Sequence, residues 1–414
     1  MSHLSFSKSW PILALSVGCF FLPTEGMAHT QCRDVMRGSL LQTLANDDTL
    51  NTTAASRENR SPEEARYQSF YIGTLLKSGQ YREALAQSEE ALLSFPDNKY
   101  LLGRQAQALL KLKHFERALN AAEQALRLNW RDAVALGLKT QALLGLRRYE
   151  QARQVAEQSL RLNSQDVVAL GLKTQALLGL KLHEPALAAA EKALVLSRQN
   201  PVPLGLKAQA LLALQRYDQA LEAAEQAIRL RRRDAVALGL KSQALLGLRQ
   251  FERALGVAEQ ALQLGQRNII ALGLKTQALL GLQRNDEALG AAEQALGLNP
   301  RDAVALGFKA DALFRLGRLE EVANLLEATR NAQTTAYQRW ITVKALLLLG
   351  RRPEALQRTV ELLQEDSAPK DPQLITFLAS FREDEIEAAI GQAVGPERLQ
   401  ALKRRLETYV GSLD

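Results

Sequence analysis

The sequence repeats itself with a period of 34 residues. The phrase Asp-Ala-Val-Ala-Leu-Gly-Leu-Lys at 132–139 recurs at 166–173, 234–241 and 302–309 with at most one substitution per copy. An alanine keeps the same spacing through seven copies: Ala84, Ala118, Ala152, Ala186, Ala220, Ala254 and Ala288. A chain of 414 residues would otherwise suggest two or three globular domains. A period of this length predicts one stacked array instead, because a single short unit cannot bury its apolar face alone.

Each repeat predicts two helices. In the copy that starts at Ala133, Leu136, Thr140 and Leu143 share one side of the first helix. The second helix, which Tyr149 opens, has a narrow stripe of small residues that lets another helix approach closely. Asp166 follows this helix and stands where it can cap the first helix of the next repeat. Stacked neighbours bury the faces that an isolated helix pair would expose.

These features resemble the tetratricopeptide repeat family. Thr140 and Ala152 match small positions of the family's signature, and Tyr149 matches the aromatic at its turn. Leu136 and Leu143 match its leucines, while Gly79, Gly317 and Gly350 occupy its inter-helix turn glycine. The resemblance covers roughly 65–369. It implies an all-α, right-handed superhelical solenoid of antiparallel helix pairs that binds a protein or peptide partner, whose identity the fold does not give.

The chain divides into five expected segments. An apolar run at 11–23, too short to span a bilayer, is followed by small residues at Gly26 and Ala28, which is typical of a cleaved signal peptide. A lipoprotein signal ending at Cys19 is the alternative. We therefore expect an exported bacterial protein, periplasmic or secreted. The segments are a signal peptide (1–28), a flexible arm (29–64), seven regular repeats (65–302), two degenerate repeats (303–369) and C-terminal capping helices (370–414).

The resemblance also implies where a partner would bind. In this family the first helix of each repeat lines the concave surface, which here is apolar and predicted to be open because glycines leave room for a ligand. Its recurring glutamines suit a peptide backbone or a sugar hydroxyl, although recent duplication of the repeats would explain them equally well. The predicted groove residues are Val134, Leu138, Gln141, Gly145, Leu172, Gln175, Gln209, Leu240, Gln243, Leu274 and Gln277.

A lysine recurs where the family usually has an apolar residue: Lys139, Lys173, Lys207, Lys241, Lys275 and Lys309. Burying an unpaired ammonium is costly, so three arrangements stay open. The stem could pack while the head group is solvated, the six could form a cationic ladder for an anionic ligand, or each could pair with a recurring glutamate. Three of those glutamates, Glu123, Glu157 and Glu225, have an arginine four residues on and predict surface ion pairs within one helix.

Composition excludes several classes of function. Four His and two Cys argue against a metal centre, and no nucleophile elbow or phosphate-binding loop is present. Aromatics at 5% are too few for a nucleic-acid stacking surface. The net charge of +7 keeps an acidic partner or surface in consideration. We expect no enzyme activity, cofactor, metal or nucleic-acid partner, and no transmembrane segment after the signal.

The sequence therefore predicts a non-enzymatic interaction scaffold in the bacterial envelope, holding a partner segment in its concave groove. The alternative is a factor in polysaccharide export or surface assembly, contacting glycan through the glutamine and lysine ladders.

Overall fold

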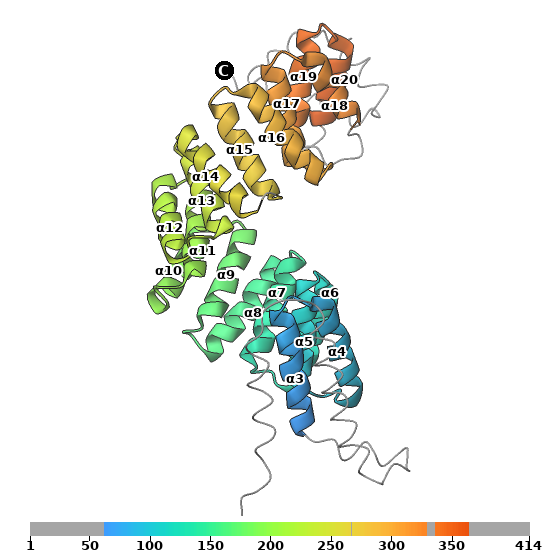
Figure 1. Cartoon of the computed structure of the whole chain (residues 1–414), viewed down its shortest axis with the longest axis vertical. Helices are drawn as coiled ribbons and strands as arrows, with labels where there is room; N and C mark the ends of the chain where they lie inside the picture. The colour runs from blue at the N-terminus through green and yellow to red at the C-terminus, as the bar shows by residue number, and fades with distance from the viewer. Residues whose placement is uncertain (1–61, 266, 329–335, 364–414) are drawn as a thin grey trace, which may run out of the picture. The chain divides into compact units, whose positions relative to one another are not determined.

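The computed structural model describes residues 62–265, 267–328 and 336–363, and all regular structure in these ranges is α-helical (Figure 1). The chain divides after Glu64 into two units. Of the first unit, only the start of one helix belongs to the described residues. The expected signal peptide and the capping segment at 370–414 lie outside the described residues, as does the expected arm up to residue 61.

The described ranges hold nine helix pairs in series. They are α3 (Pro62–Lys77), α4 (Tyr81–Ser94), α5 (Lys99–Lys111), α6 (Phe115–Leu128), α7 (Ala133–Gly145), α8 (Tyr149–Leu162), α9 (Val167–Gly179), α10 (His183–Leu196), α11 (Pro201–Ala213), α12 (Tyr217–Leu230), α13 (Ala235–Gly247), α14 (Phe251–Leu264), α15 (Ile269–Gly281), α16 (Asn285–Leu298), α17 (Ala303–Arg315), α18 (Leu319–Ala328), α19 (Ala336–Leu348) and α20 (Arg352–Leu363). The first helix begins at Pro62, three residues before the expected start of the array at 65.

Each regular first helix begins at a side-chain cap. Asp166 accepts hydrogen bonds from the backbone N–H groups of Val168 and Ala169 at 2.9 and 3.1 Å. This confirms the cap predicted at Asp166. Asp132 and Asp234 cap α7 and α13 in the same way. These bonds satisfy N–H groups that a helix start leaves without an internal partner.

The turn inside each pair contains a residue with positive φ. Glycine occupies this position at Gly79, Gly317 and Gly350, with φ between 74° and 80°. Six other turns place a long polar residue there, with φ between 57° and 61°: Lys113, Arg147, Lys181, Gln215, Arg249 and Gln283. The next residue donates its N–H back into the first helix, as Arg148 does to Leu143 O at 2.9 Å, and this closes the turn.

The core follows the predicted stripes. Leu136, Thr140 and Leu143 are at most 2% exposed, and the Thr140 hydroxyl donates to Leu136 O at 2.8 Å. On the second helix, Ala152 and Ala156 are equally buried. The core between the two helices of a pair is thus built from leucine on the first helix and alanine on the second. The small alanine side chains allow the helices to approach closely.

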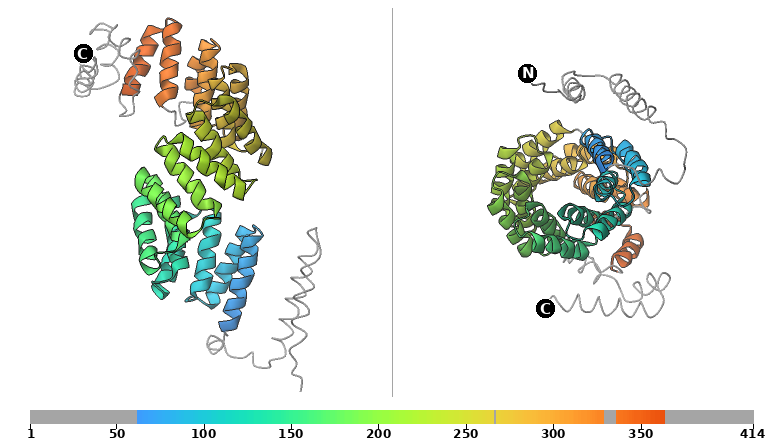
Figure 2. Two further views of the ribbon diagram at one scale, coloured as in Figure 1. Left: turned by 90° about the vertical axis from the view of Figure 1, so that its left-hand side faces the viewer. Right: turned by 90° about the horizontal axis from the view of Figure 1, so that it is seen from below.

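The array bends toward the first helix of each pair. From α5 to α17, each first helix contacts the first helix of the next pair, whereas successive second helices make at most marginal contact. First helices that lie close together while second helices splay apart give a curved stack, whose inner face the first helices line. Within the described residues of the second unit, the helix pairs wind round a common axis when seen from the end (Figure 2). The predicted fold class, an all-α superhelical solenoid of antiparallel helix pairs, is confirmed.

Candidate functional site

The inner face carries one row of exposed apolar side chains. Each is the second residue of a first helix and is between 53% and 68% exposed. We call Tyr100, Val134, Val168, Val202, Val236, Ile270 and Val304 the inner row. Helix geometry places Val134 on the same side of α7 as Gly137 and Gln141, three and seven residues on. Sequence reasoning named only Val134, although the 34-residue spacing marks the other members equally well.

The recurring glutamines flank the inner row. Gln141, Gln175, Gln243 and Gln277 are exposed, while Gln107 and Gln209 are half-buried. Each glutamine amide offers two hydrogen-bond donors and one acceptor, and it lies on the same helix face as an apolar side chain of the inner row. The structure therefore brings the predicted groove glutamines and Val134 together on one accessible surface.

The predicted groove leucines are placed differently. Leu138, Leu172, Leu240 and Leu274 are only 5–7% exposed, so they do not form the open apolar surface expected from the sequence. Each packs over a glycine of the preceding first helix: a Cβ at Gly137, for example, would lie 3.9 Å from Leu172 Cδ1. These leucines hold neighbouring repeats together, and they form the floor between members of the inner row.

The glycines at the ends of the first helices are also filled. A Cβ at Gly145 would overlap the Phe115 ring, and Gly179, Gly247 and Gly281 face Tyr149, Tyr217 and Phe251 in the same way. The room that was expected to receive a ligand instead receives the aromatic ring that opens the preceding second helix. A signal existed in the sequence, because Ala213 replaces this glycine where the preceding repeat has His183. One repeat departs from this pairing of an aromatic residue with glycine. Tyr81 opens its second helix, but the next first helix has Lys111 at the position of the glycine.

The six recurring lysines are paired with glutamates. Each Nζ lies 2.8–2.9 Å from the carboxylate sixteen residues earlier, on the second helix of the preceding pair: Lys139–Glu123, Lys173–Glu157, Lys207–Glu191, Lys241–Glu225, Lys275–Glu259 and Lys309–Glu293. The glutamate alternative is the one observed, and each of the six lysines has a carboxylate partner within the described residues. The expected pairs of Glu123, Glu157 and Glu225 with the arginines four residues on do not form within the described residues.

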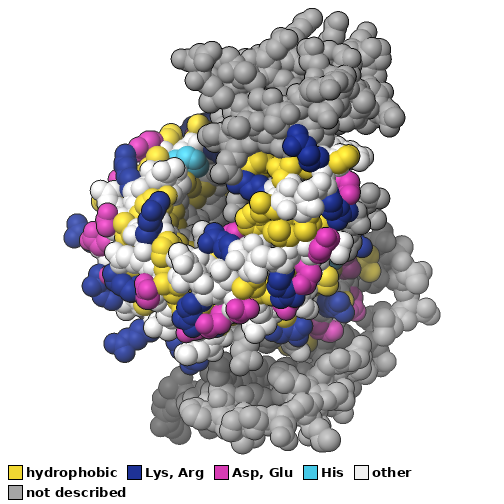
Figure 3. All heavy atoms as spheres, turned by 90° about the horizontal axis from the view of Figure 1, so that it is seen from above, with side chains coloured by type: hydrophobic (Ala, Val, Ile, Leu, Met, Phe, Trp, Pro, Cys, Tyr) yellow, Lys and Arg dark blue, Asp and Glu magenta, His cyan; other side chains and the backbone are white. Residues whose placement is uncertain are grey.

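These ion pairs lie on the opposite side of the first helices from the groove glutamines. Lys139 and Gln141 are two residues apart, which turns the side chains about 200° round the helix axis. The pairs consequently sit in the grooves between successive second helices, on the outer surface. Figure 3 shows basic and acidic side chains interspersed over the described surface in that view.

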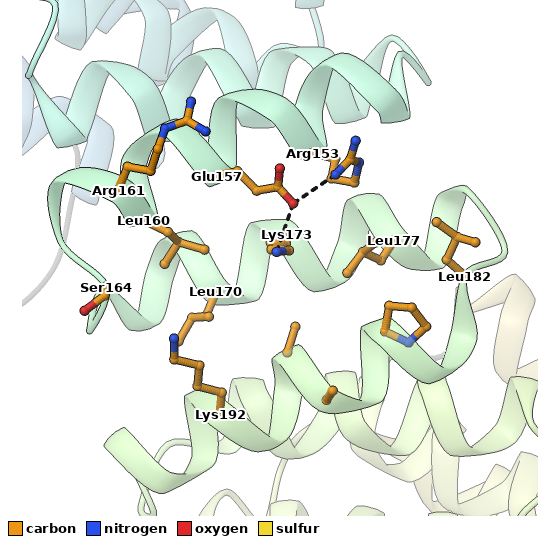
Figure 4. Close-up of a pocket in the computed structure, with 13 residues that line it drawn as sticks. Arg153, Glu157, Leu160, Arg161, Ser164, Leu170, Lys173, Leu177, Leu182 and Lys192 are labelled. Carbon is orange, nitrogen blue, oxygen red and sulfur yellow. Dashed lines mark hydrogen bonds and ion pairs between the residues drawn. The ribbon is translucent and has the colours of Figure 1, made fainter.

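The outer groove between α8 and α10 contains a network of four linked charged side chains. Glu157 accepts hydrogen bonds from Lys173 and Arg153, both at 2.9 Å (Figure 4). Arg153 also contacts Glu150 at 2.6 Å. Burial raises the pKa of the Glu157 carboxyl, but the hydrogen bonds and positive charges of Lys173 and Arg153 outweigh it and hold the pKa below its usual value. The hydrogen bond from Arg153 likewise lowers the pKa of Glu150.

The described residues contain neither a cluster of metal ligands nor a membrane-spanning helix. No group of three or more His, Cys, Asp or Glu side chains that could hold a metal ion occurs among them. In the same ranges, no helix combines the length and apolar character that a membrane span needs.

Family models described as "Tetratricopeptide repeat" match residues 74–133, 139–201, 206–269 and 279–347, which together are more than half of the chain. The chain belongs to the tetratricopeptide repeat family. Its inner row, glutamines and ion pairs are thus features of a tetratricopeptide array. A comparison with curated protein sequences found no match.

Among solved structures, one superposes well enough to support the tetratricopeptide fold. A tetratricopeptide repeat protein from Parabacteroides merdae superposes with a TM-score of 0.51 at 14% identity, covering 61% of this chain and 99% of its own. TTC0263 from Thermus thermophilus is 26% identical, with a TM-score of 0.40 over 44% of this chain and 97% of its own. Yeast Tom70 is 14% identical, with a TM-score of 0.41 over 84% of this chain and all of its own. The first of these superpositions supports the fold alone.

Proposed function

We propose that this tetratricopeptide protein is a non-enzymatic scaffold of the bacterial envelope that holds a segment of a partner protein along its inner face. Tetratricopeptide repeats suggest a protein-interaction role as a class. The observation that carries the proposal here is the inner row, seven apolar side chains that stay exposed at every repeat from α5 to α17. Exposed apolar side chains in a regular line mark a surface that gains free energy when a partner covers it.

The glutamines give this surface its polar complement. Gln141, Gln175, Gln243 and Gln277 stand exposed beside the row and can bond the peptide groups of a bound segment. A partner with apolar side chains spaced along an extended or helical segment would fit both features. The glycan alternative depended on the glutamine and lysine ladders together. It is not carried forward, because the lysines are paired with glutamates on the outer side, away from the glutamines.

The envelope location rests on the predicted signal peptide at 1–28. Its test is fractionation of cells that express the full chain, with N-terminal sequencing of the mature protein. A protein retained in the cytoplasm with an intact N-terminus would contradict this part of the proposal.

Photo-crosslinking tests the inner face directly. A photoreactive residue at Gln175 or Gln243 should give a discrete crosslinked partner in cells, whereas the same residue at Glu222 or Gln260, exposed on second helices, should not. Val134→Glu combined with Val168→Glu should abolish the crosslink without lowering the melting temperature, because both valines are more than 60% exposed. Crosslinks that arise only from Glu222 or Gln260, or that survive the valine changes, would contradict the proposal.

A further inference from the structure

The outer groove between α8 and α10 contains a pocket of about 740 Å³. The two second helices form its walls and α9 forms its floor, where Leu170 and Leu177 are 2% and 4% exposed. The corresponding groove between α4 and α6 holds a pocket of about 370 Å³, half as large. Both volumes lie in the range of pockets that bind small ligands or single side chains of a partner.

Four residues of this pocket depart from the repeat pattern. Arg153 stands where six other copies have leucine, from Leu85 to Leu289. Leu182 stands where the other copies have Arg, Gln or His, and Lys192 where they have Gln or Glu. Pro185 replaces a polar or charged residue. In an array whose copies are otherwise nearly alike, four departures that converge on one pocket set this groove apart from the others.

The pocket carries an excess of positive charge. Arg153, Arg161, Lys173 and Lys192 line it against a single carboxylate, Glu157. That carboxylate is already bonded to Lys173 and Arg153. Within the described residues, Arg161 and Lys192 make no ion pair, and both are exposed. Two cations on facing helices therefore remain available to an incoming anion.

The two available cations and the exposed Leu182 lie toward different ends of the pocket. Figure 4 shows Arg161, Ser164 and Lys192 toward one end, Leu177 and Leu182 toward the other, and Glu157 and Lys173 between them. Leu160 and Leu170 line the first end as well, and Arg153 lies on the side of Leu177. Along α10, Pro185 and Lys192 are seven residues apart, which corresponds to about 10 Å of helix rise. A ligand that uses both ends therefore needs an anionic group and an apolar group at about that separation.

We propose that this pocket is a second docking site, which binds a peptide segment carrying an acidic side chain and an apolar side chain about 10 Å apart. The carboxylate bonds Arg161 and Lys192, and the apolar side chain covers Leu177, Leu182 and Pro185. The ion pair of Glu157 with Lys173 lies between the two ends of the pocket. The N–H and C=O groups of a peptide backbone can form hydrogen bonds with it, whereas a hydrocarbon chain cannot. Because the site is on the outer surface, it can be filled while the inner face holds another segment.

Fluorescence anisotropy with a defined peptide tests the proposal on the full-length protein. The probe is a fluorescein-labelled octapeptide with two glutamates near one end and two leucines three residues further on, a separation of about 10 Å in extended chain. Arg161→Gln with Lys192→Gln should weaken binding about tenfold or more, the effect of losing charge-assisted hydrogen bonds. Leu182→Arg should weaken it too. Both Lys192→Gln and Leu182→Arg restore residue types of neighbouring copies, so the fold should be kept.

Matched controls define the outcomes that would overturn the proposal. Arg127→Gln with Arg229→Gln removes two charges, as the double variant does, from the positions equivalent to Arg161 on two other second helices, and it should leave the affinity unchanged. A peptide with glutamine in place of glutamate should bind about tenfold more weakly. Equal affinity of either the double variant or the glutamine peptide would exclude the site. Displacement of the peptide by oleate vesicles, with oleate binding that depends on Arg161 and Lys192, would assign the pocket to a lipid and overturn the peptide proposal.

Discussion

At the scale of single residues, the turns inside the helix pairs store backbone strain. Lys181 has a φ of 60°, a region that costs a residue with a side chain about 1–2 kcal/mol. Gly317 occupies the equivalent position without that cost. Lys181→Gly should therefore raise the free energy of unfolding by about 0.5–1 kcal/mol, after the extra freedom of glycine in the unfolded chain is deducted.

Urea denaturation measures this change. The reciprocal control is Gly317→Ala, which should lower the free energy of unfolding by about 1 kcal/mol. A lower midpoint for Lys181→Gly would mean that its side chain makes a stabilising contact larger than the strain.

The contact of Tyr149 with Gly179 should tolerate no side chain. A Cβ at Gly179 would overlap the tyrosine ring, so Gly179→Ala should force the ring to move and cost about 1–3 kcal/mol. Gly256→Ala is the matched control: a Cβ there meets nothing within 4 Å, and alanine should stabilise α14 by about 0.5–1 kcal/mol. Combining Gly179→Ala with Tyr149→His copies the His183 and Ala213 pair, and it should recover part of the loss. Thermal melts of the wild type and of these three variants measure the effects. Equal shifts of the melting temperature for Gly179→Ala and Gly256→Ala would contradict the packing of Tyr149 against Gly179.

At the scale of helices, ion pairs connect each second helix to the next first helix. Six such pairs repeat along the array, each partly exposed and each worth about 0.2–1 kcal/mol. The ion pairs also determine where the charges lie, because they hold each lysine on the outer side and leave apolar and amide groups on the inner face.

The network around Glu157 should make stability depend on pH. Lys173 and Arg153 hold the folded-state pKa of Glu157 below its ordinary value of 4.5, so the folded chain binds fewer protons there than the unfolded chain. The stabilisation is then fully present above pH 4.5 and is lost as the pH falls through the lower folded-state pKa. Arg153→Leu, which restores the residue of six other copies, should weaken this acid dependence. Denaturation midpoints between pH 3 and 7 measure it, and identical profiles for the two proteins would contradict the assignment.

The sequence predicted these helices well and their contacts less well. The caps, the buried side of Leu136 and Thr140, and the small stripe of the second helix are properties of one helix and its immediate neighbours along the chain. The packing around Leu138 and Gly145 is not, because it involves Gly103 and Phe115 of the preceding repeat. A helical wheel drawn for a single repeat shows those positions as open. Comparing equivalent positions across copies recovers part of this information, as Ala213 with His183 illustrates.

At the scale of the whole array, each repeat depends on its neighbours for a core. Leu211 on α11 is 1% exposed near the middle of the series. Leu211→Ala should cost about 2–5 kcal/mol through the cavity it leaves. In a nearly one-dimensional array this loss also weakens the coupling between the repeats on either side. We therefore expect a single unfolding transition to divide into two, with hydrogen exchange accelerated first in α11 and α12.

The matched control for Leu211→Ala is Leu93→Ala, because Leu93 is 86% exposed and its removal should leave both the number of transitions and the exchange pattern unchanged. Guanidinium denaturation followed by circular dichroism counts the transitions, and hydrogen exchange with mass spectrometry locates them. If Leu211→Ala lowers one transition uniformly and speeds exchange equally in every helix, the repeats unfold as one cooperative unit. Nearest-neighbour contacts would then be too strong for a single layer to uncouple, and the inner face would behave as one rigid surface.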